Sequence, residues 1–250
     1  MIFWLNLLDI KHIWFGFEWN GSYLKEMVHE GTYLLIAAIL LSISIAIYYL
    51  NSNIVFFKRN KLFNLLIILW LTQNLIMIAS VALRNSYYIN YFALAYLRIF
   101  VFFFLAACIV GLCTIIIMIL RKKSIGYLIS VNSLSVFIIV IISCCFNWDA
   151  IIARYNFAHY KKSFVHYEFL AGLNDSALPY MNYTEEQIKQ ISDVQYRSFS
   201  FASSELYTKI DFAAEISRRK TAFKQRWEQH HFLEWNYPEY KAYKLLFQNQ

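Results

Sequence analysis

The sequence has few of the residues that build phosphate-binding loops or disulfide frameworks. Its 250 residues include six glycines, two prolines and four cysteines. This excludes a glycine-rich phosphate loop. The cysteines lie in apolar runs without the spacing of a metal site, so a disulfide framework is excluded and packed apolar side chains are expected at Cys108, Cys113, Cys144 and Cys145.

Acidic residues are missing from a long central stretch of the chain. Residues 31–148 contain neither Asp nor Glu, and the basic residues there stand at the ends of apolar runs. From residue 149 onwards, acids and bases nearly balance. The net charge of +7 therefore indicates orientation in a membrane and excludes a surface for nucleic acid.

The chain is rich in apolar residues. Hydrophobic residues make up 59% and aromatic residues 19%, and the mean hydropathy is +0.42. Four runs, 32–50, 62–83, 99–120 and 125–146, are each close to the ~20 residues that a helix needs to cross ~30 Å of hydrocarbon. The sequence predicts an all-α, polytopic transmembrane bundle of four spans, with the lipid bilayer as its solvent.

The chain divides into three parts by composition. Residues 1–24 are aromatic and amphipathic, which predicts an interfacial segment on the bilayer surface. Residues 25–148 form the four-helix transmembrane domain. Residues 149–250 read as a soluble helical tail, in which Thr184 and Gln187 have the spacing of a capping box and a long helix extends to about residue 229.

The loops between the predicted spans carry the orientation signal. Six basic residues lie in two short loops, 58–61 and 121–123, whereas the opposite side carries fewer bases and most of the acids. Positive residues favour the cytoplasmic side. We therefore expect both termini and the tail to be extracytoplasmic.

With this orientation, the strongly polar residues at the membrane edge gather on one outer face. The spans contain no acid, and a charge near lipid is costly unless it is paired. An ion-pair layer is therefore predicted among Glu26, His29, Glu30, Arg84, Arg98, Asp149 and Arg154.

Three further polar residues lie at membrane depth: Gln73, Asn74 and Asn132. Interhelical hydrogen bonds account for such residues, and a path for a substrate or ion is the alternative. Small residues recur every four positions at Ala38, Ser42 and Ala46, which favours close approach of helices.

Glu26 and His29 have the Glu-x-x-His spacing of di-iron carboxylate bundles, with Glu30 on the same helical face. A complete site needs a second such motif and more carboxylates, and the other copy, Glu228-x-x-His231, lies in the tail. We expect neither a metal nor a cofactor, and a structural role for the cluster.

Particular strings resemble a known family. VHEGTYLLIAAILLSI, LRNSYYINYFALAYLRI, NWDAIIARYNF and LNDSALP occur in this order. They resemble a bacterial integral membrane family catalogued as domain of unknown function 4173, akin to the 4153 family. The resemblance implies a polytopic bacterial envelope protein without an assigned activity, and we expect it in the bacterial inner membrane. It also implies longer relatives, so the chain is expected to be a short or carboxy-terminal form.

Three functions remain open at this point. The first is a non-enzymatic envelope scaffold or regulatory subunit that binds a protein partner or associates with itself through its transmembrane helices. The second is a transporter, or part of one, with a charged outer vestibule. The third is a membrane enzyme or metal protein that uses Glu26, His29 and Glu30.

Overall fold

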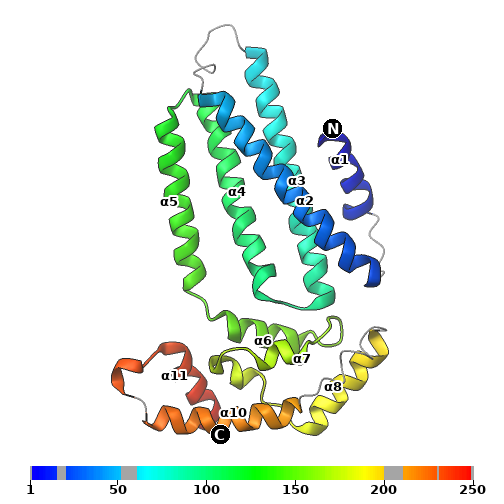
Figure 1. The fold of residues 1–250 in the computed structure, drawn as a ribbon, viewed down its shortest axis with the longest axis vertical. Helices are drawn as coiled ribbons and strands as arrows, with labels where there is room; N and C mark the ends of the chain where they lie inside the picture. Colours follow the sequence, from blue (N-terminus) through cyan, green and yellow to red (C-terminus); the bar gives the residue numbers. More distant parts are fainter. Residues whose placement is uncertain (1, 16–20, 52–60, 200–210, 230, 249–250) are drawn as a thin grey trace. The chain divides into compact units, whose positions relative to one another are not determined.

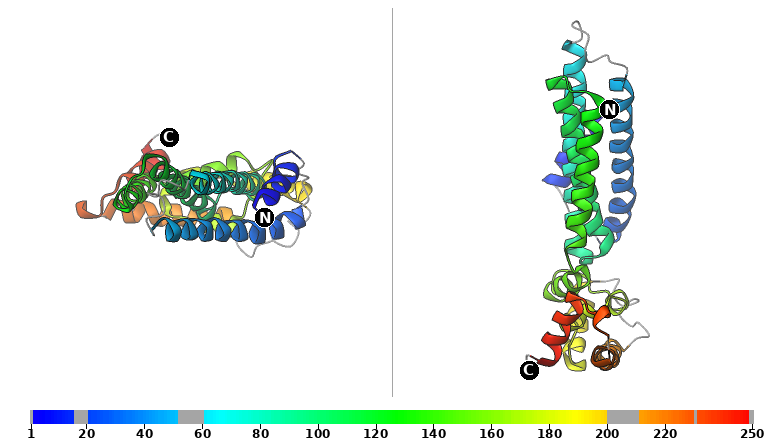
Figure 2. Two further views of the ribbon diagram at one scale, coloured as in Figure 1. Left: turned by 90° about the horizontal axis from the view of Figure 1, so that it is seen from above. Right: turned by 90° about the vertical axis from the view of Figure 1, so that its left-hand side faces the viewer.

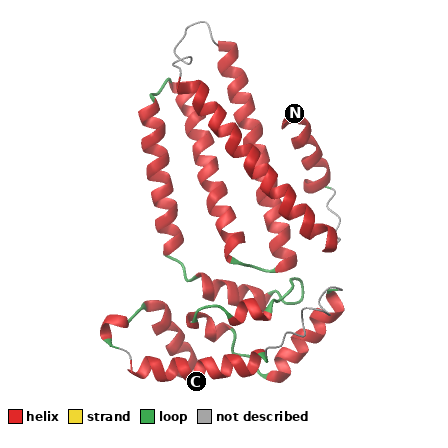
Figure 3. Ribbon diagram, viewed as in Figure 1, coloured by secondary structure: helices red, strands yellow, loops and turns green. Residues whose placement is uncertain are grey.

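The computed structural model describes residues 2–15, 21–51, 61–199, 211–229 and 231–248. Within these ranges every regular element is a helix, and no strand occurs (Figures 1 and 3). The chain forms two compact units. Unit 1 comprises Met1–Tyr88 and Leu97–Cys145, and unit 2 comprises Ile89–Tyr96 and Phe146–Gln250. The all-α class expected from the sequence is confirmed.

Unit 1 contains the long apolar helices. These are α2 (Gly21–Asn51), α3 (Lys61–Phe92, whose last turn belongs to unit 2), α4 (Tyr96–Arg121) and α5 (Ile125–Cys144). The two perpendicular views show them running lengthwise beside one another (Figures 1 and 2). A short helix, α1 (Ile2–Asp9), continues into the π-helical turn η1 (Ile10–Trp14).

The core of unit 1 lies between α2, α3 and α4. Ile39, Leu71, Val81 and Leu112 are completely buried there. Two of the small residues of α2, Ser42 and Ala46, are buried as well, so this face is used within unit 1.

Three of the described helices, α3, α4 and α5, are long and apolar enough to cross a membrane. They correspond to the predicted spans 62–83, 99–120 and 125–146. The remaining predicted span, 32–50, lies in α2, where the described apolar stretch Tyr33–Tyr48 is shorter than a membrane span. The fourth span is therefore not confirmed.

Unit 2 is built from shorter helices that follow one another along the tail. They are α6 (Trp148–Ala158), α7 (Tyr167–Ala171), the 3₁₀ turn η3 (Asp175–Tyr180), α8 (Glu185–Ser198), α10 (Phe212–Gln229), η4 (Phe232–Glu234), α11 (Tyr237–Tyr243) and the π-helical turn η5 (Lys244–Gln248). Their buried core includes Ile152, Leu170, Leu178 and Phe223.

The capping box predicted at the start of α8 is confirmed. The Gln187 backbone N–H donates to Thr184 Oγ1 at 3.3 Å, and the Thr184 N–H donates to Gln187 Oε1 at 2.9 Å. The long helix predicted to end near residue 229 is α10. Its predicted beginning, near residue 203, lies outside the described residues.

The link between α3 and α4 is an integral part of unit 2. The Asn156 carboxamide accepts from the Leu94 N–H at 2.7 Å and donates to the Leu94 carbonyl at 3.0 Å. Ser163 Oγ donates to the Asn90 carbonyl at 2.8 Å, and the Phe164 N–H donates to the Tyr91 carbonyl at 2.7 Å. Helix α6 and the residues after it thus fix the link.

Candidate functional site

A polar seam joins the amino-terminal segment to α3 within unit 1. Asn6 Nδ2 donates to the Gln73 carbonyl at 2.9 Å, and Trp14 Nε1 donates to Ser80 Oγ at 3.0 Å. In addition, the Arg84 guanidinium donates to Asp9 Oδ1 at 2.5 Å. The segment from residue 6 to residue 14 therefore contacts α3 between Gln73 and Arg84.

The charged pair of this seam is largely removed from solvent. The Arg84 side chain is 10% exposed and that of Asp9 13%. Asp9 Oδ2 and Arg84 Nε are buried without a hydrogen-bond partner, as is Asn6 Oδ1. Each buried polar atom without a partner lowers the stability of the fold by about 1–3 kcal/mol. The seam is therefore a candidate functional feature.

The partner of Arg84 was missed by sequence analysis. We expected Arg84 to pair with a carboxylate such as Glu26, Glu30 or Asp149, or with lipid phosphate, and its partner in the structure is Asp9. The signal in the sequence was Asp9, which is the acid within the apolar residues 2–14. Whether this segment lies on a bilayer surface, as predicted, stays a prediction. Its helical turns of 8 and 5 residues are too short to cross a bilayer.

The other expected members of the outer-face cluster have separate surroundings. The Arg98 guanidinium lies over the ring of Tyr88, with 4.4 Å between its carbon and the ring centroid. The Arg98 carbonyl accepts from Asn85 Nδ2 at 2.8 Å. Arg154, on α6 in unit 2, is exposed. A single ion-pair layer thus stays a prediction.

Residues 26, 29 and 30 belong to helix α2. The side chains of Glu26, His29 and Glu30 are outside the described residues. In the part of the chain that the structure describes, no group of three or more His, Cys, Asp or Glu side chains is placed to hold a metal ion. The hypothesis of a metal site on α2 therefore remains untested.

The polar residues at membrane depth bond mostly within their own helices. Asn74 Nδ2 donates to the Trp70 carbonyl and Asn132 Nδ2 to the Leu128 carbonyl, each at 2.8 Å. Asn74 is completely buried, and its Oδ1 has no hydrogen-bond partner. Gln73 takes part in an interhelical bond only through its backbone carbonyl, which accepts from Asn6.

Asn132 also marks where α5 meets α4. A Cβ atom added at Gly111 would lie 3.5 Å from Asn132 Oδ1, which is an ordinary van der Waals contact. The small residue on α4 thus brings the two helices close together at this level.

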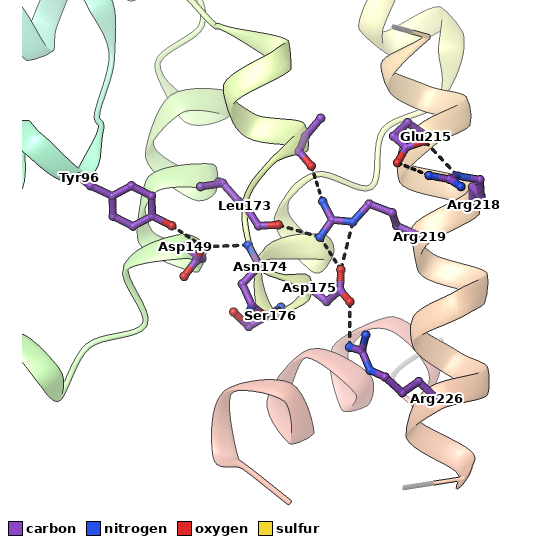
Figure 4. Close-up of polar contacts among 11 residues, drawn as sticks. Tyr96, Asp149, Leu173, Asn174, Asp175, Ser176, Glu215, Arg218, Arg219 and Arg226 are labelled. Carbon is purple, nitrogen blue, oxygen red and sulfur yellow. Dashed lines mark hydrogen bonds and ion pairs between the residues drawn. The ribbon is translucent and has the colours of Figure 1, made fainter. Parts of the chain in front are cut away.

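Unit 2 contains two carboxylates that hold its turns in place (Figure 4). Asp149 accepts from Tyr96 Oη at 2.5 Å and from the Asn174 N–H at 2.8 Å. Asn147 caps α6 by accepting from the Ala150 N–H at 3.1 Å. The first turn of α6 is therefore joined both to the start of α4 and to the turn before η3.

The second carboxylate, Asp175, lies between two arginines of α10. Arg219 Nε donates to Asp175 Oδ1 at 3.1 Å, and Arg226 donates to Asp175 Oδ2 at 2.8 Å. Arg219 also donates to the carbonyls of Ala171 and Leu173, at 2.5 and 2.7 Å. Figure 4 shows these groups converging from α10 onto the turn that begins η3.

Asp149 and Asp175 accept hydrogen bonds from groups that hold neighbouring helices and turns together. Neither Asp149 nor Asp175 is placed beside a serine or cysteine nucleophile by any bond that the structure gives it. The bonds of Asp149 and Asp175 therefore position α6 and η3.

Comparison with protein families identifies the chain. The profile described as "Domain of unknown function (DUF4153)" matches residues 2–182, well over half of the sequence. The chain belongs to the DUF4153 family. The more specific assignment to family 4173 is not confirmed, although the expected kinship with the 4153 family is. Searches of curated proteins and of solved structures give no match.

The DUF4153 match ends just after η3. Asp149 and Asp175 lie within it, whereas Arg219 and Arg226 belong to the following residues. The family region and the chain beyond it are therefore joined by charged hydrogen bonds within unit 2.

Proposed function

We propose that this DUF4153 protein is a non-enzymatic scaffold or regulatory subunit of the bacterial inner membrane, and that α5 binds a transmembrane helix of a protein partner. One observation carries the proposal. The most apolar window of α5 is 6% buried within the chain, against 39% for both α3 and α4. Helix α5 is thus the candidate span with the most free surface.

The exposed side of α5 carries small residues in helical register. Gly126, Ser130 and Ser133 are all exposed and recur at intervals of four and three positions. Small residues permit close approach of a second helix, and serine hydroxyls hydrogen-bond across such contacts. A helix that contacts only lipid gains no stability from close approach or from serine hydroxyl groups.

Site-specific photocrosslinking in intact membranes tests this proposal. A benzoylphenylalanine at Ser133 should capture one defined protein, whereas the same group at Leu69, an exposed apolar residue of α3, should capture none. Enlarging the small face with Ser130→Ile should abolish capture from position 133. Capture of lipid alone at position 133 would contradict the proposal, and capture of a second copy of this chain would define the partner as itself.

The packing within unit 2 bears on which side of the membrane the tail lies. Because the α3–α4 link and the chain after α5 pack in one unit, an even number of crossings must separate residues 96 and 146. Helices α4 and α5 supply two. The basic residues 121–123 between them favour the cytoplasm, so unit 2 is extracytoplasmic in this proposal.

Transport is the second candidate, and the buried polar atoms of unit 1 favour it. Asn74 Oδ1, Asn6 Oδ1 and Asp9 Oδ2 lie in or against apolar helices without a hydrogen-bond partner. Polar groups of this kind mark pathways in many membrane proteins. Proton flux into proteoliposomes that stays unchanged in Asn74→Leu, with Asn90→Leu as the exposed control, would argue against this candidate.

A further inference from the structure

Unit 2 exposes a group of large side chains near the end of the chain. We call it the aromatic ridge: Leu233, Trp235, Tyr237, Tyr240 and Leu245, which are 76, 51, 63, 38 and 39% exposed. They lie in η4, in the link that follows it, in α11 and at the start of η5. Several large exposed apolar and aromatic side chains within one short segment indicate an interaction surface.

The ridge is not the core side of α11. Ala242 and Leu246 are buried on the opposite side of the same turns. Tyr243 stacks on Trp227 of α10, with ring centroids 5.6 Å apart. The inner face of α11 is therefore already packed, and its outer face carries a second apolar surface.

Lysines accompany the ridge. Lys241 and Lys244 are exposed and follow Tyr237 at intervals of four and three, so the three residues share one face. No ion pair between described residues involves either lysine. Two lysines of α10, Lys220 and Lys224, lie 5.8 and 5.6 Å from the ring of Phe247 in η5.

The two acids of this segment have local contacts. Glu239 is half-buried, and its backbone N–H donates to Asn236 Oδ1, the cap of α11, at 2.9 Å. The exposed Glu234 accepts from the His231 N–H at 3.3 Å. The exposed residues of α11 are Tyr237, Pro238, Tyr240 and Lys241, so none of them is a carboxylate. In contrast, the outer face of α8 is polar and contains Glu185, Glu186 and Gln190.

We propose that the aromatic ridge docks unit 2 on the surface of an anionic bilayer. Trp and Tyr rings favour the headgroup level because one end is apolar and the other polar, and lysines there attract lipid phosphates. The same chain carries three candidate membrane spans, so a bilayer is always within reach. The ridge lies beyond residue 182, outside the DUF4153 match, and none of its residues belongs to the partner face proposed on α5.

The test uses spin labels on the full chain, with the four native cysteines replaced by alanine. The protein is reconstituted in vesicles of phosphatidylcholine with about one-third phosphatidylglycerol, a content that gives the surface a negative potential. Labels are placed at Tyr237→Cys on the ridge and at Gln190→Cys on α8. Both positions are exposed, so neither label needs to disturb the core.

Collision rates with oxygen and with a water-soluble nickel chelate then report the depth of each label. We expect the ratio of the oxygen collision rate to the nickel collision rate to be several-fold higher for the label at 237 than for the label at 190. Lys241→Glu with Lys244→Glu should return position 237 to the values of position 190. Equal nickel access at both positions would overturn the proposal. A label at 237 that is water-exposed and becomes immobile only with added membrane proteins would also overturn it, in favour of a protein partner.

Discussion

Asp175 is the side chain on which the order of unit 2 most depends. Its carboxylate is 16% exposed and accepts from Arg219 and Arg226. Asp175→Asn leaves two guanidinium groups without their counter-charge, so we expect η3 and α10 to open more easily, by about 2–3 kcal/mol. Hydrogen exchange of peptides from both elements, measured on the full chain, gives this free energy directly.

The matched control is the exposed pair between Glu215 and Arg218. The Arg218 side chain is 77% exposed, and its bond to Glu215 holds the pKa of that carboxyl below its usual value. Water and salt screen such a pair. Glu215→Gln should leave exchange of α10 unchanged, and equal effects of the two substitutions would show that Asp175 is not a special position.

Tyr167 should make unit 2 sensitive to alkali. Burial raises the pKa of its phenol above the ordinary 10.0, while a 3.2 Å contact with Ser192 Oγ opposes this shift. The neutral ring is therefore favoured in the folded state. Its contribution to stability is present below pH 10 and is lost as the pH rises through the folded-state pKa.

Tyr167→Phe should accordingly lose less stability between pH 8 and pH 11 than the natural chain. Near-ultraviolet circular dichroism of the protein in detergent follows the thermal midpoint at both values. Tyr237→Phe, at an exposed position, is the control. An alkaline loss in Tyr167→Phe as large as in the natural chain would contradict the assignment.

Helix α6 binds the link between α3 and α4 through Asn156. Asn156 is 2% exposed and satisfies both backbone groups of Leu94. Asn156→Leu leaves a buried N–H and a buried carbonyl unpaired, which should destabilise unit 2 by about 2–3 kcal/mol. Exchange of the 89–96 link should then accelerate, whereas Asn182→Leu, at an exposed asparagine, should have no such effect.

Helical register could be predicted from sequence where local chemistry determines it. The Thr184 capping box and the apolar runs of α3, α4 and α5 act through near neighbours in the chain, so their positions follow from spacing. The bonds Asp9–Arg84 and Asn156–Leu94 join residues 75 and 62 positions apart. No local pattern distinguishes such partners from other polar residues in apolar surroundings.

For the chain as a whole, the shared packing of unit 2 makes a definite prediction about sides. Cysteines introduced at Asn90 and Gln190, in the cysteine-free background, should react from the same side of the membrane. A cysteine at Ser124, between α4 and α5, should react from the opposite side. Labelling of intact cells with a membrane-impermeant maleimide tests this, and a shared side for positions 124 and 190 would contradict it.

Composition was sufficient to predict three helices that are long and apolar enough to cross a membrane, because hydrocarbon leaves a chain few alternatives. It was not sufficient to divide the chain into its two units. The link 89–96 is aromatic and lies between two spans, so it reads as membrane edge, and only its bonds to Asn156 and Ser163 assign it to unit 2.

That link also sets an order of events during synthesis. The ribosome makes residues 89–96 well before Asn156, Ser163 and Phe164, which hold them. In between it makes α4 and α5, both of which are apolar enough for insertion. The link therefore waits without its partners until the helical hairpin has been translated. Unit 2 can therefore fold to completion only after α4 and α5 have been made, so a pause in their translation delays its folding.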